Sequence, residues 1–211
     1  MKIVACSDTH TQQDSLVVPD GDVFVFAGDH TGNGEPWETK RFNEWLGTLP
    51  HPHKIVIAGN HDRNLEQYPH IKWITNATYL LDSSIVIDGV KFYGSPWTPE
   101  FCEWAFMKDL GEPMRMVWKE IPDNTDVLIT HGPPHMVFDL CPDGSRAGCD
   151  ELKERISNLN LKAHIFGHIH MRGYMDGVTN EVTWAPGTGF YNVSVLDHQY
   201  RMKYPITKIQ I

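Results

Sequence analysis

Five short apolar runs recur along the chain, and each of them ends in polar residues. Runs of this length that are rich in β-branched and aromatic residues are typical of buried strands. They cover residues 2–6, 22–27, 55–58, 126–130 and 163–166. We therefore predict five buried strands, each followed by a turn that carries polar side chains.

Helices and a hairpin are predicted between these strands. A helix beginning at Pro36 has apolar residues at three- and four-residue spacing, which forms one packed face: Phe42, Trp45, Leu46 and Leu49. Another helix begins at about Asp150, with Leu152, Ile156 and Leu159 on one face. Residues 84–94 predict a β-hairpin around a tight Asp88-Gly89 turn, residues 100–118 predict helical turns, and 181–184, 192–196 and the segment from 201 predict strands.

The alternation of strands and helices favours an α/β protein. No repeat, linker or low-complexity segment divides the 211 residues. The polar residues at the strand ends run from Asp8 to His170, so a domain boundary within that span would divide them. We therefore expect one domain over residues 1–211.

Composition and charge argue against some classes of binding partner. Its 41% hydrophobic and 21% charged residues are ordinary for a globular protein, and the net charge of -9 argues against a nucleic-acid polymer as the main partner. No apolar run approaches membrane-spanning length, and residues 2–5 enter a strand directly without a signal peptide. We expect a cytoplasmic protein with no membrane partner, whose four cysteines are reduced thiols; the number of subunits stays open.

The polar residues at the strand ends have the chemistry of metal ligands. Ligands bind at the carboxyl ends of strands in α/β folds. The donors are mixed nitrogen and oxygen without thiolate, which suits Mn, Fe, Zn or Co. They exceed what one ion needs, whereas two ions that share a bridging carboxylate use them well and suit displacement at phosphorus. The candidates are Asp8, His10, Asp29, Asn60, His131, His168 and His170, with His61 in addition.

The ordered motifs resemble those of the calcineurin-like metallophosphoesterase superfamily. They are Asp8-x-His10, Gly28-Asp29, Gly59-Asn60-His61-Asp62, His131 and Gly167-His168-x-His170. Residues 42–46, 54–61, 94–97 and 130–134 are further similar to the metallophosphoesterase-domain-containing proteins, a branch associated with hydrolysis of cyclic-nucleotide and other phosphodiesters. The resemblance implies a four-layer α/β/β/α sandwich with the site at the C-terminal tips of the strands.

The resemblance also implies a role for each motif residue. One metal ion is held by Asp8, His10 and His170, the other by Asn60, His131 and His168, and Asp29 bridges the two. His61 corresponds to the catalytic histidine that protonates the leaving oxygen or stabilises the charged transition state, with Asp62 behind it to orient the ring. The nucleophile is then a hydroxide that bridges the two cations.

These observations lead us to expect a dinuclear phosphodiesterase that acts on small substrates such as cyclic nucleotides, with Mn the foremost cation and Fe, Zn, Co or Mg as alternatives. The rival functions are a phosphomonoesterase or protein phosphatase, a nuclease, and a non-catalytic metal-binding scaffold. His30, His135, Arg63 and Arg172 lie beside the motifs and contact either substrate or solvent. Loops around Trp97, Pro133-Pro134 and residues 187–191 are expected to form the rim, where Trp97 and Phe101 either stack on a base or pack the loop.

Overall fold

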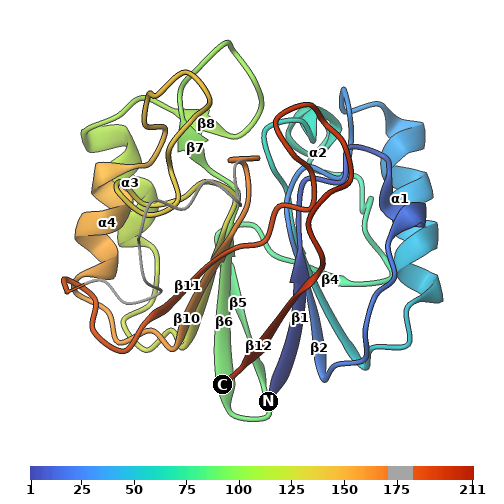
Figure 1. The fold of residues 1–211 in the computed structure, drawn as a ribbon, viewed down its shortest axis with the longest axis horizontal. Coiled ribbons are helices and arrows are strands. Elements are labelled where there is room, and N and C mark those ends of the chain that lie inside the picture. Colours follow the sequence, from blue (N-terminus) through green and yellow to red (C-terminus); the bar gives the residue numbers. More distant parts are fainter. Residues whose placement is uncertain (171–182) are drawn as a thin grey trace.

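Two five-stranded β-sheets face each other, with helices on the outside (Figure 1). The computed structural model describes residues 1–170 and 183–211. The predictions for Arg172 and for residues 181 and 182 lie outside the described residues. None of the helices in the described part of the chain is long and apolar enough to cross a membrane.

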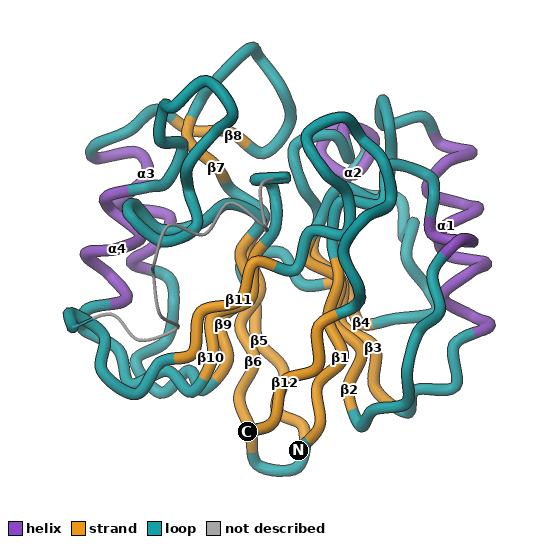
Figure 2. Tube along the Cα trace, viewed as in Figure 1, coloured by secondary structure: helices purple, strands orange, loops and turns teal. Residues whose placement is uncertain are grey.

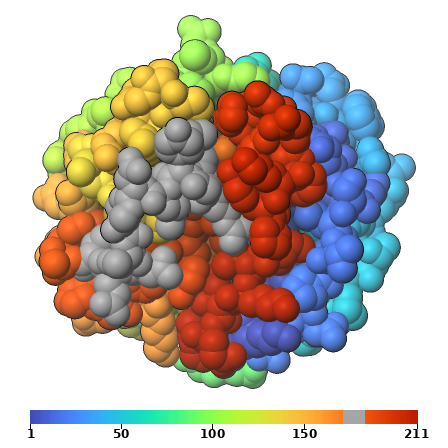
Figure 3. Space-filling view, in the orientation of Figure 1, coloured from blue at the N-terminus to red at the C-terminus, as the bar shows by residue number. Residues whose placement is uncertain are grey.

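The first sheet contains the three N-terminal strands of the sequence. Its order is β12 (Thr207–Gln210), β1 (Lys2–Cys6), β2 (Val23–Ala27), β3 (His53–Ile57) and β4 (Thr78–Tyr79). Strands β1 to β4 are parallel, and β12 pairs with β1 in the antiparallel direction. The C-terminal residues therefore lie against the N-terminal ones on the face shown in Figure 3.

The second sheet has the same plan. Its order is β11 (Gly189–Asn192), β10 (Ala163–Phe166), β9 (Val127–Thr130), β6 (Val90–Ser95) and β5 (Ser83–Ile87). Here β11, β10, β9 and β6 are parallel, and β5 is the antiparallel partner of β6 in the predicted hairpin. Asp88 and Gly89 both have positive φ, 48° and 79°, as a two-residue hairpin turn requires.

Helices and short elements connect the strands (Figure 2). The predicted helices are present as α1 (Pro36–Thr48) and α4 (Asp150–Ile156), and α1 begins with a capping box between Glu35 and Glu38. Residues 100–111 are mostly loop rather than helical turns, and the helix α3 (Glu112–Lys119) begins only after them. Elements that the pattern did not predict are η1 (Gln13–Ser15), α2 (Arg63–Gln67), β4, β7 (Thr98–Pro99) and β8 (Met107–Lys108), of which β7 and β8 pair as a separate two-stranded sheet.

Three apolar clusters hold the layers together. The largest lies between the two sheets and joins residues such as Ile55 and Val25 to Ile129 and Ile165. Phe42 and Leu46 of α1 pack on the outer face of the first sheet. The helices α3 and α4 pack on the outer face of the second sheet, through side chains that include Trp118 and Ile156. The described elements thus lie in the order helix, sheet, sheet, helices (Figure 1), and the predicted α/β class is confirmed.

Candidate metal centre

The motif residues of both sheets meet at one edge of the sandwich. Strands β1, β2 and β3 of the first sheet are parallel, and so are β9 and β10 of the second, so each sheet brings its carboxyl ends to a common edge. Hydrogen bonds join the two edges. The backbone N–H of His168, which follows β10, donates to both carboxylate oxygens of Asp8, which follows β1, each at 3.1 Å.

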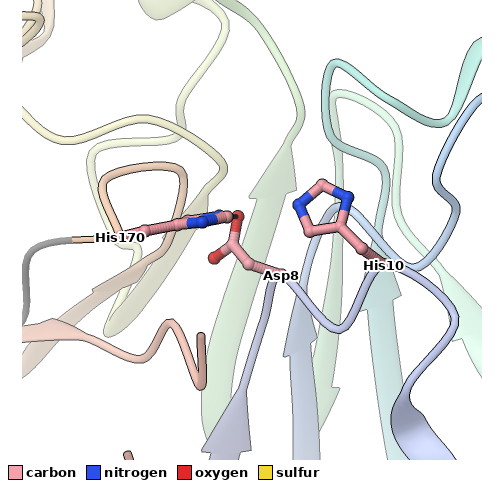
Figure 4. A group of neighbouring side chains, drawn as sticks. All are labelled: Asp8, His10 and His170. Carbon is pink, nitrogen blue, oxygen red and sulfur yellow. Dashed lines mark ion pairs between the residues drawn. The ribbon is translucent and has the colours of Figure 1, made fainter. Parts of the chain in front are cut away.

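The first group of metal-ligating atoms belongs to Asp8, His10 and His170, all within 4.8 Å of one another. Figure 4 shows the Asp8 carboxylate lying between the two imidazoles. Asp8 Oδ1 is 3.3 Å from His170 Nε2. Burial alone raises the pKa of Asp8, but the hydrogen bond and charge of His170 outweigh it, so this pKa is lowered and the carboxylate is ionised.

The second group consists of Asp29, His131 and His168. Asn60 completes it, because its Oδ1 lies 2.9 Å from His131 Nε2. Burial lowers the pKa of His168 to about 3, which leaves its ring neutral. Burial also acts to lower the pKa of His131, but the adjacent Asp29 carboxylate raises it to about 9. Without a metal ion, the His131 ring therefore carries an extra proton at pH 7. Its positive charge balances the negative charge of the Asp29 carboxylate.

Asp29 lies between the two groups. Its Oδ2 atom is 3.3 Å from His131 Nε2 and 3.7 Å from His10 Nε2, while its Oδ1 atom accepts a hydrogen bond of 2.8 Å from the backbone N–H of His61. Burial raises the pKa of Asp29, but the surrounding histidines lower it well below its usual value. The geometry is that of a carboxylate able to reach ions on both sides.

Backbone carbonyls each hold one nitrogen of three histidine rings. The Nδ1 atoms of His10, His131 and His61 lie 2.9, 2.9 and 2.7 Å from carbonyl oxygens of Thr31, Ala27 and Gly32. Since a carbonyl only accepts, each Nδ1 carries the proton and donates it, and the Nε2 lone pair is free in the neutral ring. Among the described residues, the buried Nε2 of His10 has no hydrogen-bond partner. A buried nitrogen without a hydrogen-bond partner is well suited to ligate a metal ion.

The strand ends adopt a strained backbone that aims these side chains inward. Asp8, Asp29 and His168 have φ values of 56°, 61° and 67°, in the left-handed region that costs non-glycine residues about 1–3 kcal/mol and is concentrated at functional sites. Glycines stand beside them because there is no space for a side chain. A Cβ on Gly59 would meet the Asp29 carboxylate and the His131 ring, and one on Gly167 would meet Asp8.

The structure corrects the expected pairing of His61 with Asp62. The His61 ring is oriented by the Gly32 carbonyl oxygen, as described above. The Asp62 carboxylate is fully buried and accepts hydrogen bonds from the backbone N–H groups of Asp29 (2.9 Å) and Gly59 (2.8 Å) and from Thr31. Asp62 thus fixes the loops that carry Asp29 and Asn60, because the turn after β3 sends adjacent side chains in different directions.

Three other candidates lie away from the centre. His30 is fully buried, 3.0 Å from Asp62 and 2.9 Å from Thr39 Oγ1, and belongs to the support under the site. His135 Nδ1 pairs with Asp150 at 2.6 Å near the surface. The Arg63 guanidinium lies over the ring of Trp104, 4.4 Å from its centroid. None of these three lines the cleft in the part of the chain that the structure describes.

A cleft of about 470 Å³ opens onto the centre. Its walls include His61 and three aromatic side chains, Phe101, Trp104 and Tyr200. Trp97 lies outside it and donates a hydrogen bond of 2.8 Å to Asp82, and the expected rim segments 133–134 and 187–191 are also absent from the described walls. The described lining contains neither lysine nor arginine. Trp104 and Tyr200 were not predicted, because no motif or periodicity marks them.

Comparison with known proteins shows which family the chain resembles. Residues 1–172 match the calcineurin-like phosphoesterase family. The chain is 38% identical to metallophosphoesterase domain-containing protein 1 of Homo sapiens and of Mus musculus, over 97% of this chain and 69% of each relative. A UPF0046 protein of Caenorhabditis elegans is 39% identical over 81% of this chain and 63% of its own length. A solved structure with 16% sequence identity superposes with a TM-score of 0.66 over 94% of this chain and 91% of that one, which shows the fold alone.

The chain belongs to the calcineurin-like phosphoesterase family. The expected membership is thereby confirmed, and with it the class of metal-dependent phosphoesterases. The His and Asp groups at the strand ends are the candidate ligands for divalent cations in this chain.

Proposed function

We propose that this protein is a phosphodiesterase that hydrolyses small phosphodiesters with the help of two divalent cations. Asp8, His10 and His170 would hold one cation, Asn60, His131 and His168 the other, and Asp29 both. The position of Asp29 between two donor groups, 3.3 Å from His131 and 3.7 Å from His10, is the observation that carries the proposal. Manganese suits the mixed imidazole, carboxylate and amide donors, and Fe, Zn, Co and Mg are alternatives.

The ligand atoms fit cations of this kind. The donors are ionised carboxylates, an amide oxygen and imidazole Nε2 atoms, and the buried His10 Nε2 has no other partner among the described residues. When bound, two cations would neutralise the phosphate and lower the pKa of water. The residues of the chain supply the rest: carbonyl oxygens hold the rings of His10 and His131 toward the centre, and Asp62 fixes the backbone of Asp29.

His61 is the best candidate to assist the leaving group. Its Nε2 is free because Nδ1 donates to Gly32, and a ring nitrogen of His61 lies within 4.8 Å of ligand atoms of His10 and Asp29. A protonated imidazole there can donate its proton to the departing oxygen. His61→Gln is therefore expected to keep its metal content but lower kcat about a hundredfold, with a smaller loss for the good leaving group p-nitrophenolate. An ion missing from the variant would instead make His61 a ligand.

The cleft favours small diesters over other esters of phosphate. A phosphomonoester carries one more negative charge than a diester, yet neither lysine nor arginine is found in the described lining to balance it. A nucleic-acid polymer needs a basic surface to follow, and the net charge is -9. Phe101 and Tyr200 offer aromatic surface, 39% and 50% exposed, on which a base can stack. Cyclic nucleotides combine these properties.

Relative kcat/KM values decide between the rivals. The panel comprises a cyclic nucleotide, bis-p-nitrophenyl phosphate, p-nitrophenyl phosphate and a single-stranded oligonucleotide, all at the same Mn²⁺ concentration. We expect the two small diesters to be preferred. A tenfold preference for the monoester or the oligonucleotide, about 1.4 kcal/mol in transition-state binding, would replace the proposal by a phosphomonoesterase or a nuclease. No turnover of any ester by metal-loaded protein would favour the scaffold.

A further inference from the structure

We infer that Trp104 is a positioning residue that holds the His61 imidazole in its reactive orientation. The inference rests on the proposed function, because it concerns how His61 acts. Trp104 stacks on the His61 ring with 4.1 Å between the ring centroids and 30° between the planes. It is partly buried and forms part of the cleft wall.

The hydrogen bond between His61 Nδ1 and Gly32 does not by itself fix the imidazole. A single hydrogen bond restrains one atom, and the ring can still swing about that contact. The His10 ring meets His61 edge-on, at 4.5 Å and 82°. The face of Trp104 adds the missing restraint, because two stacked planar rings leave little freedom of tilt. Together these contacts direct His61 Nε2 toward the centre.

The loop of Trp104 is attached to the same strand end as His61. The backbone N–H of Ala105 donates to the Asn60 carbonyl oxygen at 3.1 Å, and that of Phe106 donates to Glu66 at 2.9 Å. Ala105 and Phe106 are 3% and 2% exposed and pack with Ala58 and Leu65. The residues that follow Trp104 are thus anchored to Asn60, which precedes His61, and to α2, which follows it, so the two rings are placed by one local framework.

The second neighbour of the Trp104 ring is polar. The Arg63 guanidinium lies 4.4 Å from its centroid. A cation on an aromatic face is attracted by the negative potential of the ring, which adds to the restraint on the indole. The Trp104 ring therefore lies between Arg63, the first residue of α2, and the His61 ring, and it contacts both.

A double-mutant cycle in the metal-loaded protein tests this role. Trp104→Leu is expected to lower kcat about tenfold for diesters with poor leaving groups, with less effect on p-nitrophenyl esters and with KM and metal content unchanged. Trp104→Phe, which keeps an aromatic face, should recover most of the rate. In the His61→Gln background the same Trp104→Leu change should alter kcat less than about twofold, because its effect passes through His61.

Trp97→Leu is the matched control. Trp97 packs on Phe106 of the same region, 5.7 Å between centroids, but lies outside the cleft walls. The Trp97→Leu variant is expected to show the wild-type dependence of kcat on the leaving group. Equal losses from Trp104→Leu in both backgrounds, a loss of metal, or a rise in KM without a fall in kcat would each overturn the positioning role.

Spectra of the His61 ring separate this inference from the proposed function. If the wild-type protein hydrolyses no ester, the proposed function fails, and the inference is then judged by NMR on zinc-loaded protein, with the His61 signals identified by their loss in His61→Gln. We expect nuclear Overhauser effects between the ring protons of His61 and His10. Their intensity should fall in Trp104→Leu and stay at the wild-type level in Trp97→Leu. Unchanged contacts in Trp104→Leu would overturn the inference.

Discussion

The Asp62→Asn substitution changes one group beneath the metal centre. The two carboxylate oxygens of Asp62 divide their partners: Oδ2 accepts from the N–H groups of Asp29 and Gly59, and Oδ1 accepts from the N–H and hydroxyl of Thr31. Oδ1 also lies 3.0 Å from His30 Nδ1. An asparagine keeps one of these oxygens and places an NH2 group against the donors of the other. Either the N–H of Thr31, or the N–H groups of both Asp29 and Gly59, thereby lose their acceptor, since the Thr31 hydroxyl can still donate to the His61 carbonyl oxygen.

The expected loss of stability follows from that count. Leaving a buried donor unsatisfied costs about 1–3 kcal/mol, so one or two of them cost about 1–6 kcal/mol. For a domain of this size, 1 kcal/mol corresponds to about 2–4 °C, which places the fall in Tm at roughly 2–24 °C. Metal affinity should also fall, because Asp62 holds the backbone of Asp29.

The assay is urea and thermal unfolding of chelator-treated protein, since bound metal would add its own stabilisation. Asp14→Asn serves as control, because Asp14 pairs with Arg41 at the surface with about half of each side chain exposed, and an exposed pair contributes at most about 1 kcal/mol. An Asp62→Asn protein with the wild-type unfolding midpoint and a hundredfold lower kcat would refute the reasoning. It would restore Asp62 to the role of orienting His61.

Two further substitutions and one measurement of proton release test the centre. Asp29→Asn should reduce the occupancy of at least one metal and most of the turnover, as metal analysis would show; an Asn variant with both metals and a normal rate would remove Asp29 from the bridging role. Metal binding at pH 7 should release a proton from His131, whose pKa is raised to about 9 by Asp29, so apparent affinity should increase with pH until about pH 9; calorimetry in buffers of different ionisation enthalpy measures this, and equal heats in all buffers would contradict it. Gly59→Ala should lower metal content, because the added methyl group meets Asp29 and His131; full occupancy would show that the loop yields at little cost.

The sequence predicted the parts of the fold that local pattern determines. Strand β2 is a continuous apolar run, Val-Phe-Val-Phe-Ala, and α1 has a proline start and a regular apolar face. Short elements such as α2, with five residues, and β4, with two, carry too little pattern to be predicted. They form because tertiary packing holds Leu65 and Tyr79 in place.

The candidate site was predictable where ligand chemistry is tied to strand ends. Asp8, Asp29 and His131 come together because parallel strands bring their carboxyl ends to one edge. The direction of each side chain was not predictable, because it depends on turns. Asp62 follows His61 directly, yet its carboxylate supports Asp29 while the His61 ring meets Gly32. The contact of Trp104 with His61 joins residues 43 positions apart and leaves no trace in the sequence.

The number and place of the cations test the account most directly. Anomalous diffraction from crystals of the Mn²⁺-loaded protein, recorded at the manganese edge, locates each ion without reference to activity. We predict two peaks on either side of Asp29, about 3.5–4 Å apart, one beside Asp8, His10 and His170 and the other beside Asn60, His131 and His168. A single peak at full loading, or peaks away from Asp29, would contradict the dinuclear centre.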